Sequence, residues 1–156
     1  MRTLYTFCCL MAALWLFSCS PTDKKAQPAD ETETAVAAPA PAVQPLATEA
    51  FIRDIFDFRS EPQWKYKGSL PCVIDFYTDW CKPCQMMAPV MERMAEAYQG
   101  RILFYKVNAD TEPELAQYFN IQAIPCFLFC PTEGEPNMTM GGMTEEQLRQ
   151  ILDNLH

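Results

Sequence analysis

Histidine is almost absent from this sequence, and its scarcity excludes several kinds of catalytic centre. The only histidine among the 156 residues is the last one, His156. Metal sites built mainly on imidazole need several histidines, and Ser–His or Cys–His nucleophilic pairs need one held within the core. We therefore expect neither kind of site in this chain, and our principal prediction includes no metal.

Basic residues are also few. Twelve Lys and Arg stand against 20 Asp and Glu, which gives a formal net charge of −8. Proteins that bind the phosphate backbone of nucleic acids carry basic surfaces, because that binding is largely electrostatic. The composition therefore argues against nucleic acid as a partner.

The sequence lacks an apolar run long enough to span a bilayer well. Its longest run, residues 4–17, would form a helix of about 21 Å against a hydrocarbon core of ~30 Å. With Arg2 in front of it, the run has the basic start and short apolar middle of a secretory signal. We predict a signal peptide over residues 1–18.

Cys19 stands where this apolar run ends. The residues Leu16-Phe17-Ser18-Cys19 resemble the lipobox of bacterial lipoproteins, in which the cysteine is lipidated and becomes the new N-terminus. Phe17 departs from that pattern, since the position usually carries a smaller side chain. The sequence predicts a lipid anchor on Cys19 and a location on the periplasmic side of a bacterial envelope. Release as a soluble periplasmic or secreted protein is the alternative.

Residues 19–50 are predicted to form a disordered tether. Five prolines and nine alanines lie between Ser20 and Ala50, and no aromatic residue does. Such a segment buries too little apolar area to offset the conformational entropy lost on folding. We expect it to hold a folded domain, residues 51–156, away from a membrane.

The folded domain is predicted to alternate strands with helices. Continuous apolar runs predict buried strands, and apolar residues three or four apart predict helices. The expected strands are 72–77, 102–107, 126–130 and 138–141, with a short edge strand at 64–67, and the expected helices cover 51–56, 86–98, 112–119 and 145–155. This order predicts an α/β fold with a central mixed β-sheet flanked by helices on both faces.

Local signals mark where some of these helices begin and what they bury. Thr111 is the predicted N-cap of the third helix, with Pro113 in its first turn. Thr144 and Gln147 have the spacing of a capping box at the start of the last helix. The methionines of the second helix are predicted to fill the core: Met86, Met87, Met91 and Met94.

The chemistry of the sequence is concentrated in Trp80-Cys81-Lys82-Pro83-Cys84. A position between a buried strand and a helix places Cys81 at a helix N-terminus, where partial positive charge and free N–H groups favour the thiolate. Lys82 adds a cation within reach, and Cys84, one turn further along, is positioned to close a disulfide onto Cys81. Zinc ribbons also have two cysteines separated by two residues. The redox interpretation therefore depends on the strand before the motif and the helix after it.

In this context the chain resembles the thioredoxin family over essentially all of residues 51–156. The motifs that carry the resemblance occur in the family's order: Asp75-Phe76-Tyr77, Trp80 to Cys84, Pro89, Lys106 to Asp110, Ile124-Pro125 and Gly141-Gly142. Lys82 stands where thioredoxins usually have glycine, and Cys126 where they usually have threonine. The resemblance implies a thioredoxin fold and a thiol–disulfide oxidoreductase.

The resemblance also implies roles for the residues of the reacting centre. Cys81 attacks a protein disulfide as a thiolate, and Cys84 resolves the mixed disulfide. Asp75, alone in a buried strand and held partly neutral by desolvation, exchanges the proton of Cys84, and Lys106 across the sheet modulates it. A paired polar core residue is the alternative interpretation of Asp75.

A second group of residues is implied in substrate binding. The Ile124–Pro125 bond is expected to be cis, so that the backbone of Ile124 turns towards Cys81 and meets an extended substrate segment. The remaining residues of the expected docking surface are Trp80, Lys82, Pro83, Gly141 and Gly142.

Three further cysteines lie in the domain. Cys72 and Cys130 lie on strands that are neighbours in the thioredoxin fold, and we interpret them as small buried hydrophobes. Cys126, directly after Pro125, is either a third reactive thiol or a passive substitute for threonine.

The predicted function is that of a lipid-anchored monomer that exchanges thiols and disulfides in exported proteins without a cofactor. Pro83 resembles the reducing thioredoxins, whereas the export signal directs the chain to a compartment in which disulfides form. Reduction there requires an unidentified membrane electron donor as a partner. An oxidising or isomerising role is the alternative direction.

Two hypotheses from other functional classes are also compatible with the sequence. Cys81, Cys84, Cys126 and Cys130 are enough thiolates for a metal or iron–sulfur site. A binding module without turnover would require that Cys81 and Cys84 never cycle between thiol and disulfide.

Overall fold

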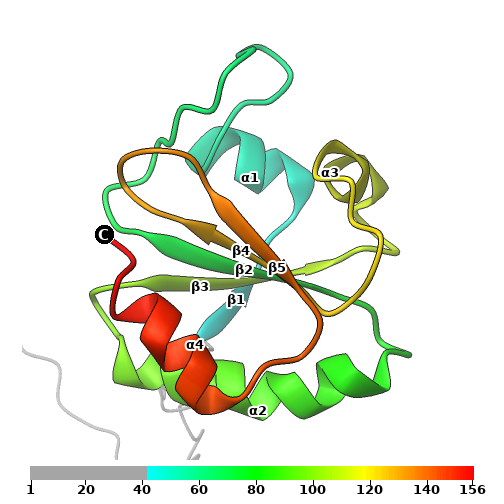
Figure 1. Cartoon of the computed structure of the whole chain (residues 1–156). Helices are drawn as coiled ribbons and strands as arrows, with labels where there is room; N and C mark the ends of the chain where they lie inside the picture. The colour runs from blue at the N-terminus through cyan, green and yellow to red at the C-terminus, as the bar shows by residue number, and fades with distance from the viewer. Residues whose placement is uncertain (1–41) are drawn as a thin grey trace, which may run out of the picture. The chain divides into compact units, whose positions relative to one another are not determined.

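The computed structural model describes residues 42–156, so the predicted signal peptide, Cys19 and most of the predicted tether lie outside the described residues. The elements in chain order are β1 (Val43–Pro45), α1 (Thr48–Asp54), β2 (Cys72–Tyr77), α2 (Lys82–Ala97), β3 (Leu103–Asn108), α3 (Pro113–Tyr118), β4 (Cys126–Cys130), β5 (Asn137–Met140) and α4 (Glu145–Leu152). Figure 1 shows them around one sheet.

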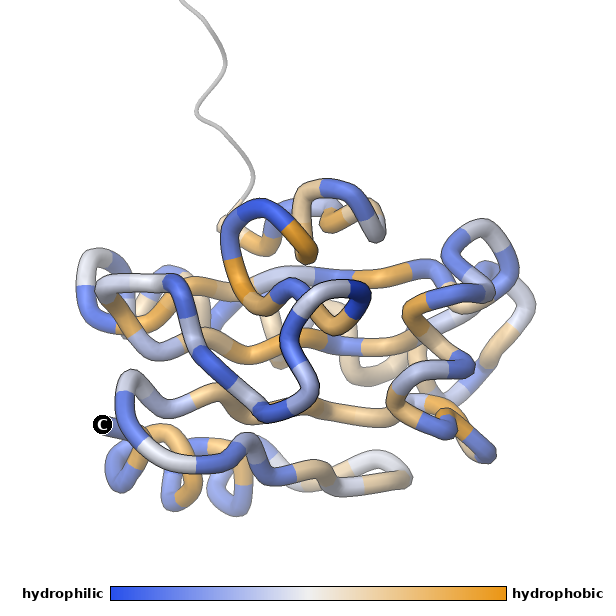
Figure 2. The backbone as a smooth tube through the Cα atoms, turned by 90° about the horizontal axis from the view of Figure 1, so that it is seen from above, coloured by the Kyte–Doolittle hydropathy of each residue, from blue (hydrophilic) through white to orange (hydrophobic). Residues whose placement is uncertain are grey.

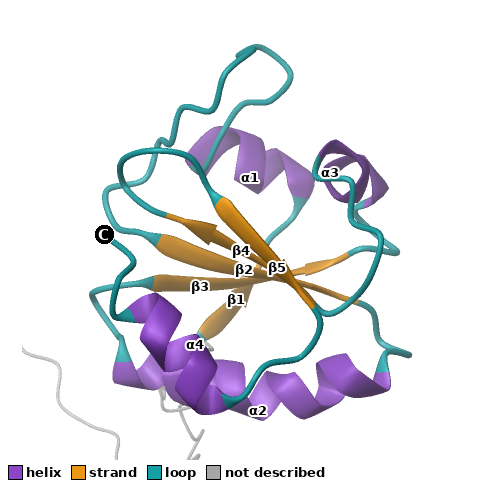
Figure 3. Ribbon diagram, in the orientation of Figure 1, coloured by secondary structure: helices purple, strands orange, loops and turns teal. Residues whose placement is uncertain are grey.

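The sheet has five strands in the order β1-β3-β2-β4-β5. Strands β1, β3 and β2 run parallel, whereas β4 runs antiparallel to β2 and β5 antiparallel to β4. Helices α1 and α3 cover one face, and α2 and α4 cover the other (Figures 1 and 3). The predicted mixed sheet with helices on both faces is confirmed.

Strand alternation divides the core between the two faces. Along β2, Cys72, Ile74 and Phe76 pack with residues of α1 and α3, while Val73 packs with α2 and α4. Strand β4 is buried along its whole length, as expected for a strand covered on both sides. Figure 2 shows apolar residues concentrated along the strands and hydrophilic residues in the loops.

The predicted boundary between tether and domain is wrong for residues 43–50. Val43 and Leu46 are buried, and the Leu46 amide donates to the Lys106 carbonyl at 2.9 Å beside the β1–β3 pairing. Helix α1 then starts at Thr48, whose amide and hydroxyl both donate to the Glu112 carboxylate at 2.8 and 2.6 Å. The proline- and alanine-rich composition concealed a strand that forms only when β3 is present to pair with it.

Residues 64–67 do not form the predicted edge strand. The whole segment between α1 and β2 is irregular. The alternation of aromatic and charged residues at 64–67, which predicted the strand, has another cause. The Trp64 ring packs against Phe56 at 4.7 Å between centroids and stacks with Tyr66 at 6.3 Å. Every second side chain here covers the α1 face of the core, and no ladder of backbone hydrogen bonds accompanies it.

Besides that of α1, two helix starts differ from the prediction, and the fourth agrees. Helix α2 begins at Lys82, four residues before the apolar periodicity starts, because Cys81 is its N-cap. Helix α3 begins at Pro113 with Glu112 as N-cap, and the Thr111 hydroxyl donates to the Asn108 carbonyl at 3.3 Å and does not cap the helix. The capping box of Thr144 and Gln147 is present at the start of α4.

Within residues 42–156, none of the helices has the length and apolar character needed to cross a bilayer.

Candidate functional site

A disulfide joins Cys81 and Cys84 where β2 gives way to α2. The S–S distance is 2.04 Å and the Cα atoms are 5.3 Å apart. Cys81 is the N-cap of α2, and its sulfur accepts a hydrogen bond from the Cys84 amide at 3.1 Å. The two residues are almost equally buried, at 5% and 4% exposed.

The environment of Cys81 favours a thiolate once the disulfide is reduced. The first turn of a helix presents unpaired N–H groups and the positive end of the helix dipole, both of which stabilise negative charge on sulfur. Pro83 lies in this first turn, where a missing N–H costs nothing. Lys82 and Pro83 are both exposed beside the disulfide.

Asp75 lies in the interior directly behind this site. It is 5% exposed, it pairs in register with Lys106 of the neighbouring strand, and its Oδ1 has no hydrogen-bond partner. Burial raises the pKa of Asp75 to about 7, and the nearby Lys106 ammonium acts in the opposite direction. The expectation of a partly neutral carboxyl agrees with this shift.

A pocket of about 260 Å³ connects Asp75 with the disulfide. Asp75, Cys84 and Lys106 all line it, and so do Thr78 and Glu92. The cavity has room for several water molecules, and these polar side chains on its wall can hydrogen-bond to them. Protons can therefore move between the carboxyl of Asp75 and the sulfur of Cys84 without direct contact of the two groups.

Glu92 and Thr78 are pocket residues that sequence reasoning missed. Glu92 lies two helical turns after Cys84, and its carboxylate accepts from the Val43 amide at 3.4 Å. Thr78 is buried, and its hydroxyl has no hydrogen-bond partner. The spacing of Cys84, Ala88 and Glu92 on one face of α2 was a signal in the sequence that points to the pocket.

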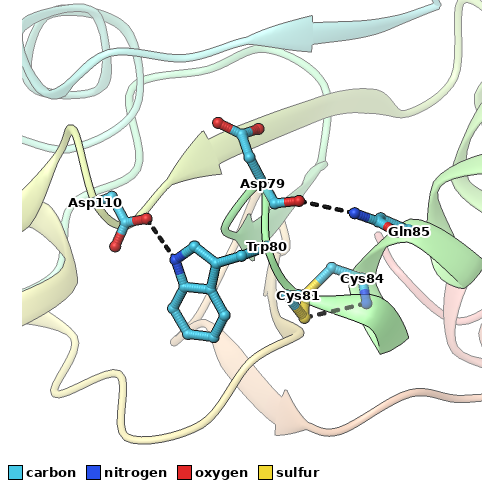
Figure 4. Close-up of a disulfide and its surroundings, with 6 residues drawn as sticks. All are labelled: Asp79, Trp80, Cys81, Cys84, Gln85 and Asp110. Carbon is cyan, nitrogen blue, oxygen red and sulfur yellow. Dashed lines mark hydrogen bonds between the residues drawn. A yellow bond between two sulfur atoms is a disulfide. The ribbon is translucent and has the colours of Figure 1, made fainter.

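Hydrogen bonds brace the loop before Cys81, as Figure 4 shows. The Trp80 indole N–H donates to Asp110 at 2.9 Å, and the Gln85 amide group donates to the Asp79 carbonyl at 2.7 Å. Asn108, at the end of β3, donates to the Asp79 carboxylate at 3.1 Å. These bonds hold the segment after β2 against the segment after β3, while Trp80 stays 69% exposed.

The segment before β4 lies at this same end of the sheet. Cys126 pairs with Phe76, so Pro125 lies beside the residues that follow β2. The Ile124–Pro125 bond is cis, as expected. The Pro125 carbonyl accepts from the Gly141 amide at 2.8 Å, which ties the two predicted docking loops together.

The structure requires glycine at only one position of the Gly141–Gly142 pair. Gly141 has a φ of +90°, in the region that side chains disfavour. A Cβ added to Gly142 would lie 3.9 Å from the Met87 side chain, which is ordinary contact. Backbone conformation therefore explains the first glycine of the pair and not the second.

Exposed apolar side chains lie on the elements that meet at the disulfide end of the sheet. Met86 in the first turns of α2 is 70% exposed, and Met140, which pairs with Cys126, is 55% exposed. The prediction that Met86 fills the core is therefore wrong, because its position on α2 faces outward, whereas Met87, Met91 and Met94 are buried as predicted. Together with Trp80, Met86 and Met140 form an apolar rim at the site.

The other three cysteines of residues 42–156 are free and buried. Burial, with a further contribution from Asp75, raises the pKa of the Cys126 thiol to about 11, which disfavours the reactive thiolate form. Of the two interpretations of Cys126, the structure supports the passive one.

The four-thiolate alternative is not supported. Cys130 lies at the far end of β4 from Cys126, paired with Cys72. In the part of the chain that the structure describes, no three cysteine, histidine or acidic side chains are arranged to hold a metal ion. The four thiolates that this alternative requires do not converge.

Comparisons with known proteins agree with this geometry. The sequence model of the Thioredoxin family matches residues 63–154. A thioredoxin of Borreliella burgdorferi is 35% identical over 107 residues, which cover 69% of this chain and 92% of that protein. Thioredoxin 1 of Chlorobaculum tepidum is 38% identical over 83 residues, which cover 53% of this chain and 82% of that protein.

A solved structure has the same fold. The crystal structure of chloroplastic thioredoxin z superposes with a TM-score of 0.62 at 23% identity, covering 72% of this chain and 93% of the other. The matched family region contains the Cys81–Cys84 disulfide and the Ile124–Pro125 bond. The chain therefore belongs to the thioredoxin family, and it is a protein disulfide oxidoreductase.

Proposed function

We propose that this chain reduces disulfides in exported proteins by two successive thiol exchanges. In the reduced form, the Cys81 thiolate attacks a substrate disulfide, and the other substrate sulfur leaves as a thiolate that takes up a proton. The Cys84 sulfur then attacks the Cys81 sulfur, which releases the second substrate thiol and forms the Cys81–Cys84 disulfide. Two electrons pass from the chain to the substrate.

The observation that carries the exchange chemistry of this proposal is the position of Cys81 as the N-cap of α2, and the resemblance of Pro83 to the reducing thioredoxins supports its direction. Its sulfur accepts from the Cys84 amide at 3.1 Å and lies at the positive end of a 16-residue helix. Both features stabilise negative charge on Cys81, the sulfur that must attack the substrate disulfide first.

Asp75 supplies the proton acceptor that the second step needs. Cys84 must lose its proton before it attacks, and a base works best when its pKa is near the pH of operation. Asp75, with its pKa raised to about 7, lines the same pocket as Cys84. We assign to Asp75 the role of general base for Cys84, with Lys106 favouring its ionised form.

Substrate docking is assigned to the apolar rim and the two loops beside it. Met86, Met140 and the ring of Trp80 offer apolar contact area, and unbranched methionines adapt to varied partners. The backbone of Ile124, next to Pro125, offers hydrogen bonds to an extended segment of the substrate. Such a surface fits unfolded or flexible disulfide-containing segments.

The N-terminal sequence supports action on exported proteins. Residues 1–18 have the features of a secretory signal, and Cys19 ends a segment that resembles a lipobox. A reductase in the envelope needs electrons from a membrane donor, which is the partner that this proposal requires.

Metabolic labelling with a radioactive fatty acid tests the anchor. The wild-type chain produced in a bacterium is expected to incorporate label, and a Cys19→Ser variant is expected to incorporate none. A Cys9→Ser variant is the matched control, since that cysteine lies within the predicted signal peptide. Equal labelling of the wild type and Cys19→Ser would show that Cys19 is not the lipidated residue.

The direction of electron flow is tested by the equilibrium reduction potential of the Cys81–Cys84 pair. Fluorescence of Trp80, followed in dithiol buffers of known potential, reports the transition, and a Trp80→Phe variant identifies its signal. A value near about −270 mV indicates a reductase, whereas about −120 to −180 mV indicates an oxidant or isomerase and would overturn the proposed direction.

A further inference from the structure

Cys72 and Cys130 form a pair that the active site does not use. Cys72 is the first residue of β2 and Cys130 the last of β4, and the two are directly opposite each other in the antiparallel pairing. Both are completely buried and both are free thiols. They lie at the end of the sheet opposite to Cys81, since Cys126 at the other end of β4 is about 13 Å further along the strand.

The pairing geometry suits a disulfide. Residues opposite each other in antiparallel strands have Cα atoms about 4.5 or 5.5 Å apart, depending on the type of pair. Disulfides span Cα separations of about 4.4–6.8 Å, so both types of pair fall within the range. Cys126 is the natural comparison, because it is equally buried on the same strand but is opposite Phe76.

The two thiols are not equivalent. Hydrogen bonding with Cys130, assisted by the Tyr66 hydroxyl, lowers the pKa of Cys72 despite burial. The same contact with Cys72, together with burial, raises the pKa of Cys130. Each thiol is the hydrogen-bond neighbour of the other, so that whichever sulfur is oxidised first, taken here as Cys72, can be resolved by its partner.

Access to the pair runs through the loop of residues 55–71. Tyr66 in this loop contacts Cys72, and its hydroxyl donates to the Leu70 carbonyl at 2.5 Å. The Lys67 amide donates to the Ile55 carbonyl at 2.8 Å. A segment without helix or strand, held by few hydrogen bonds, is of the kind that opens locally without global unfolding. A small oxidant can therefore reach a pair that a protein substrate cannot.

We propose that Cys72 and Cys130 are a second dithiol–disulfide couple, oxidised by small hydroperoxides to a cross-strand bond between β2 and β4. The Cys72 thiolate attacks a peroxide oxygen, the O–O bond breaks, and hydroxide or alkoxide leaves and takes up a proton. The Cys130 thiol then attacks the sulfur of the Cys72 sulfenic acid, and water leaves with the Cys130 proton. Two electrons pass to the peroxide, and a thiol reductant reverses the reaction.

The test is disulfide mapping of the reduced full chain after treatment with hydrogen peroxide. Free thiols are alkylated before digestion and mass spectrometry. Cleavage at Asp75 and Asp79 separates Cys72 from Cys81, and chymotryptic cleavage after Phe127 and Phe129 separates Cys126 from Cys130. We expect a peptide that joins Cys72 to Cys130, about tenfold more abundant than any peptide that joins Cys126, because only the opposite pair has disulfide geometry. Dithiothreitol should release it.

Three variants sharpen the result. Cys126→Ala should retain the Cys72–Cys130 link, and Cys130→Ala should lose it and carry Cys72 on to higher oxidation states. Tyr66→Ala should accelerate formation of the link, because it removes the cover over Cys72. The wild-type experiment is decisive even if a variant fails to fold.

Two outcomes would overturn the proposal. One is that Cys126 is joined to Cys72 as often as Cys130 is in the folded chain. The other is that Cys72 is recovered as a free thiol under peroxide treatment that fully oxidises Cys81 and Cys84.

Discussion

At one end of the β2–β4 pair, a disulfide lies at the start of a helix, ringed by exposed Trp80, Met86 and Met140. At the other end, Cys72 and Cys130 are opposite each other under a loop, completely buried and reduced. Cysteine pairs at the two ends of the same strands thus differ in helix contact, access and charge environment. Both pairs react through cysteine sulfur, so it is their surroundings that determine which pair exchanges with protein disulfides.

Loss of the helix-capping thiol should give the largest effect. Cys81→Ser is expected to lower the rate of insulin reduction in the presence of dithiothreitol to the uncatalysed level, because a serine hydroxyl cannot form the mixed disulfide. Cys126→Ala, which removes a buried thiol near the same end of the sheet, should retain activity. Comparable losses in both variants would mean that the activity does not depend on the helix-capping position.

The buried carboxyl of Asp75, behind the Cys81–Cys84 disulfide, should make the stability of the fold depend on pH. The pKa of Asp75 is raised from 3.8 to about 7 in the folded protein, so the folded state binds the proton more tightly than the unfolded chain. The stability contributed by neutral Asp75 is complete below the unfolded pKa and is lost as pH rises to about 7. The shift of about three pKa units corresponds to roughly 4 kcal/mol.

Asp75→Asn should therefore be more stable than the wild type at pH 8, with the difference vanishing near pH 4. Urea unfolding of the oxidised protein at both pH values measures this. The control is Glu133→Gln, which neutralises an exposed carboxylate in the loop between β4 and β5. An Asp75→Asn variant with the wild-type pH profile would contradict the assignment.

At the far end, peroxide treatment should stabilise the fold without affecting disulfide reduction. The cysteines are 130 − 72 = 58 positions apart, and a disulfide closing such a loop stabilises by up to about 4 kcal/mol in the chain-entropy model. Peroxide-treated wild type, with Cys81 and Cys84 reduced again by a protein dithiol too large to enter the loop, should unfold at higher urea concentration than treated Cys72→Ala. Equal midpoints would argue against a cross-strand bond.

The smallest effect is expected at the hydrogen bond that braces Trp80. Trp80→Phe keeps the aromatic surface and removes the donor to Asp110, which is worth about 1 kcal/mol. We expect a several-fold rise in KM for a protein disulfide, with little change in the reduction potential of Cys81–Cys84. An unchanged KM would exclude this hydrogen bond from substrate docking.

Several features could be read from the sequence because they depend on neighbours in the chain. The apolar runs predicted β2 and β4, Thr144 and Gln147 predicted the capping box, and the strand before Cys81 with the helix after it predicted the site. Periodicity, capping and X-Pro chemistry act over a few residues, so their signals survive without knowledge of the fold.

Features missed by the sequence analysis depend on partners far along the chain. Strand β1 is three residues long and exists through its parallel pairing with β3, some 60 positions away. The irregular course of residues 64–67 follows from aromatic packing against α1. Exposure of Met86 depends on which side of α2 meets the sheet, a rotation that apolar content alone does not specify.

The thioredoxin signature therefore sufficed to identify the reacting cysteines, the helix that holds Cys81 and the class of reaction. Folding added the pocket shared by Asp75, Cys84 and Glu92, and it placed Cys72 opposite Cys130. These arrangements come from strand register and from the packing of α2 on the sheet. Helical spacing could place Glu92 on the same face of α2 as Cys84. It could not bring that face to Asp75, because register and packing join residues distant in the chain and are decided only when the sheet assembles.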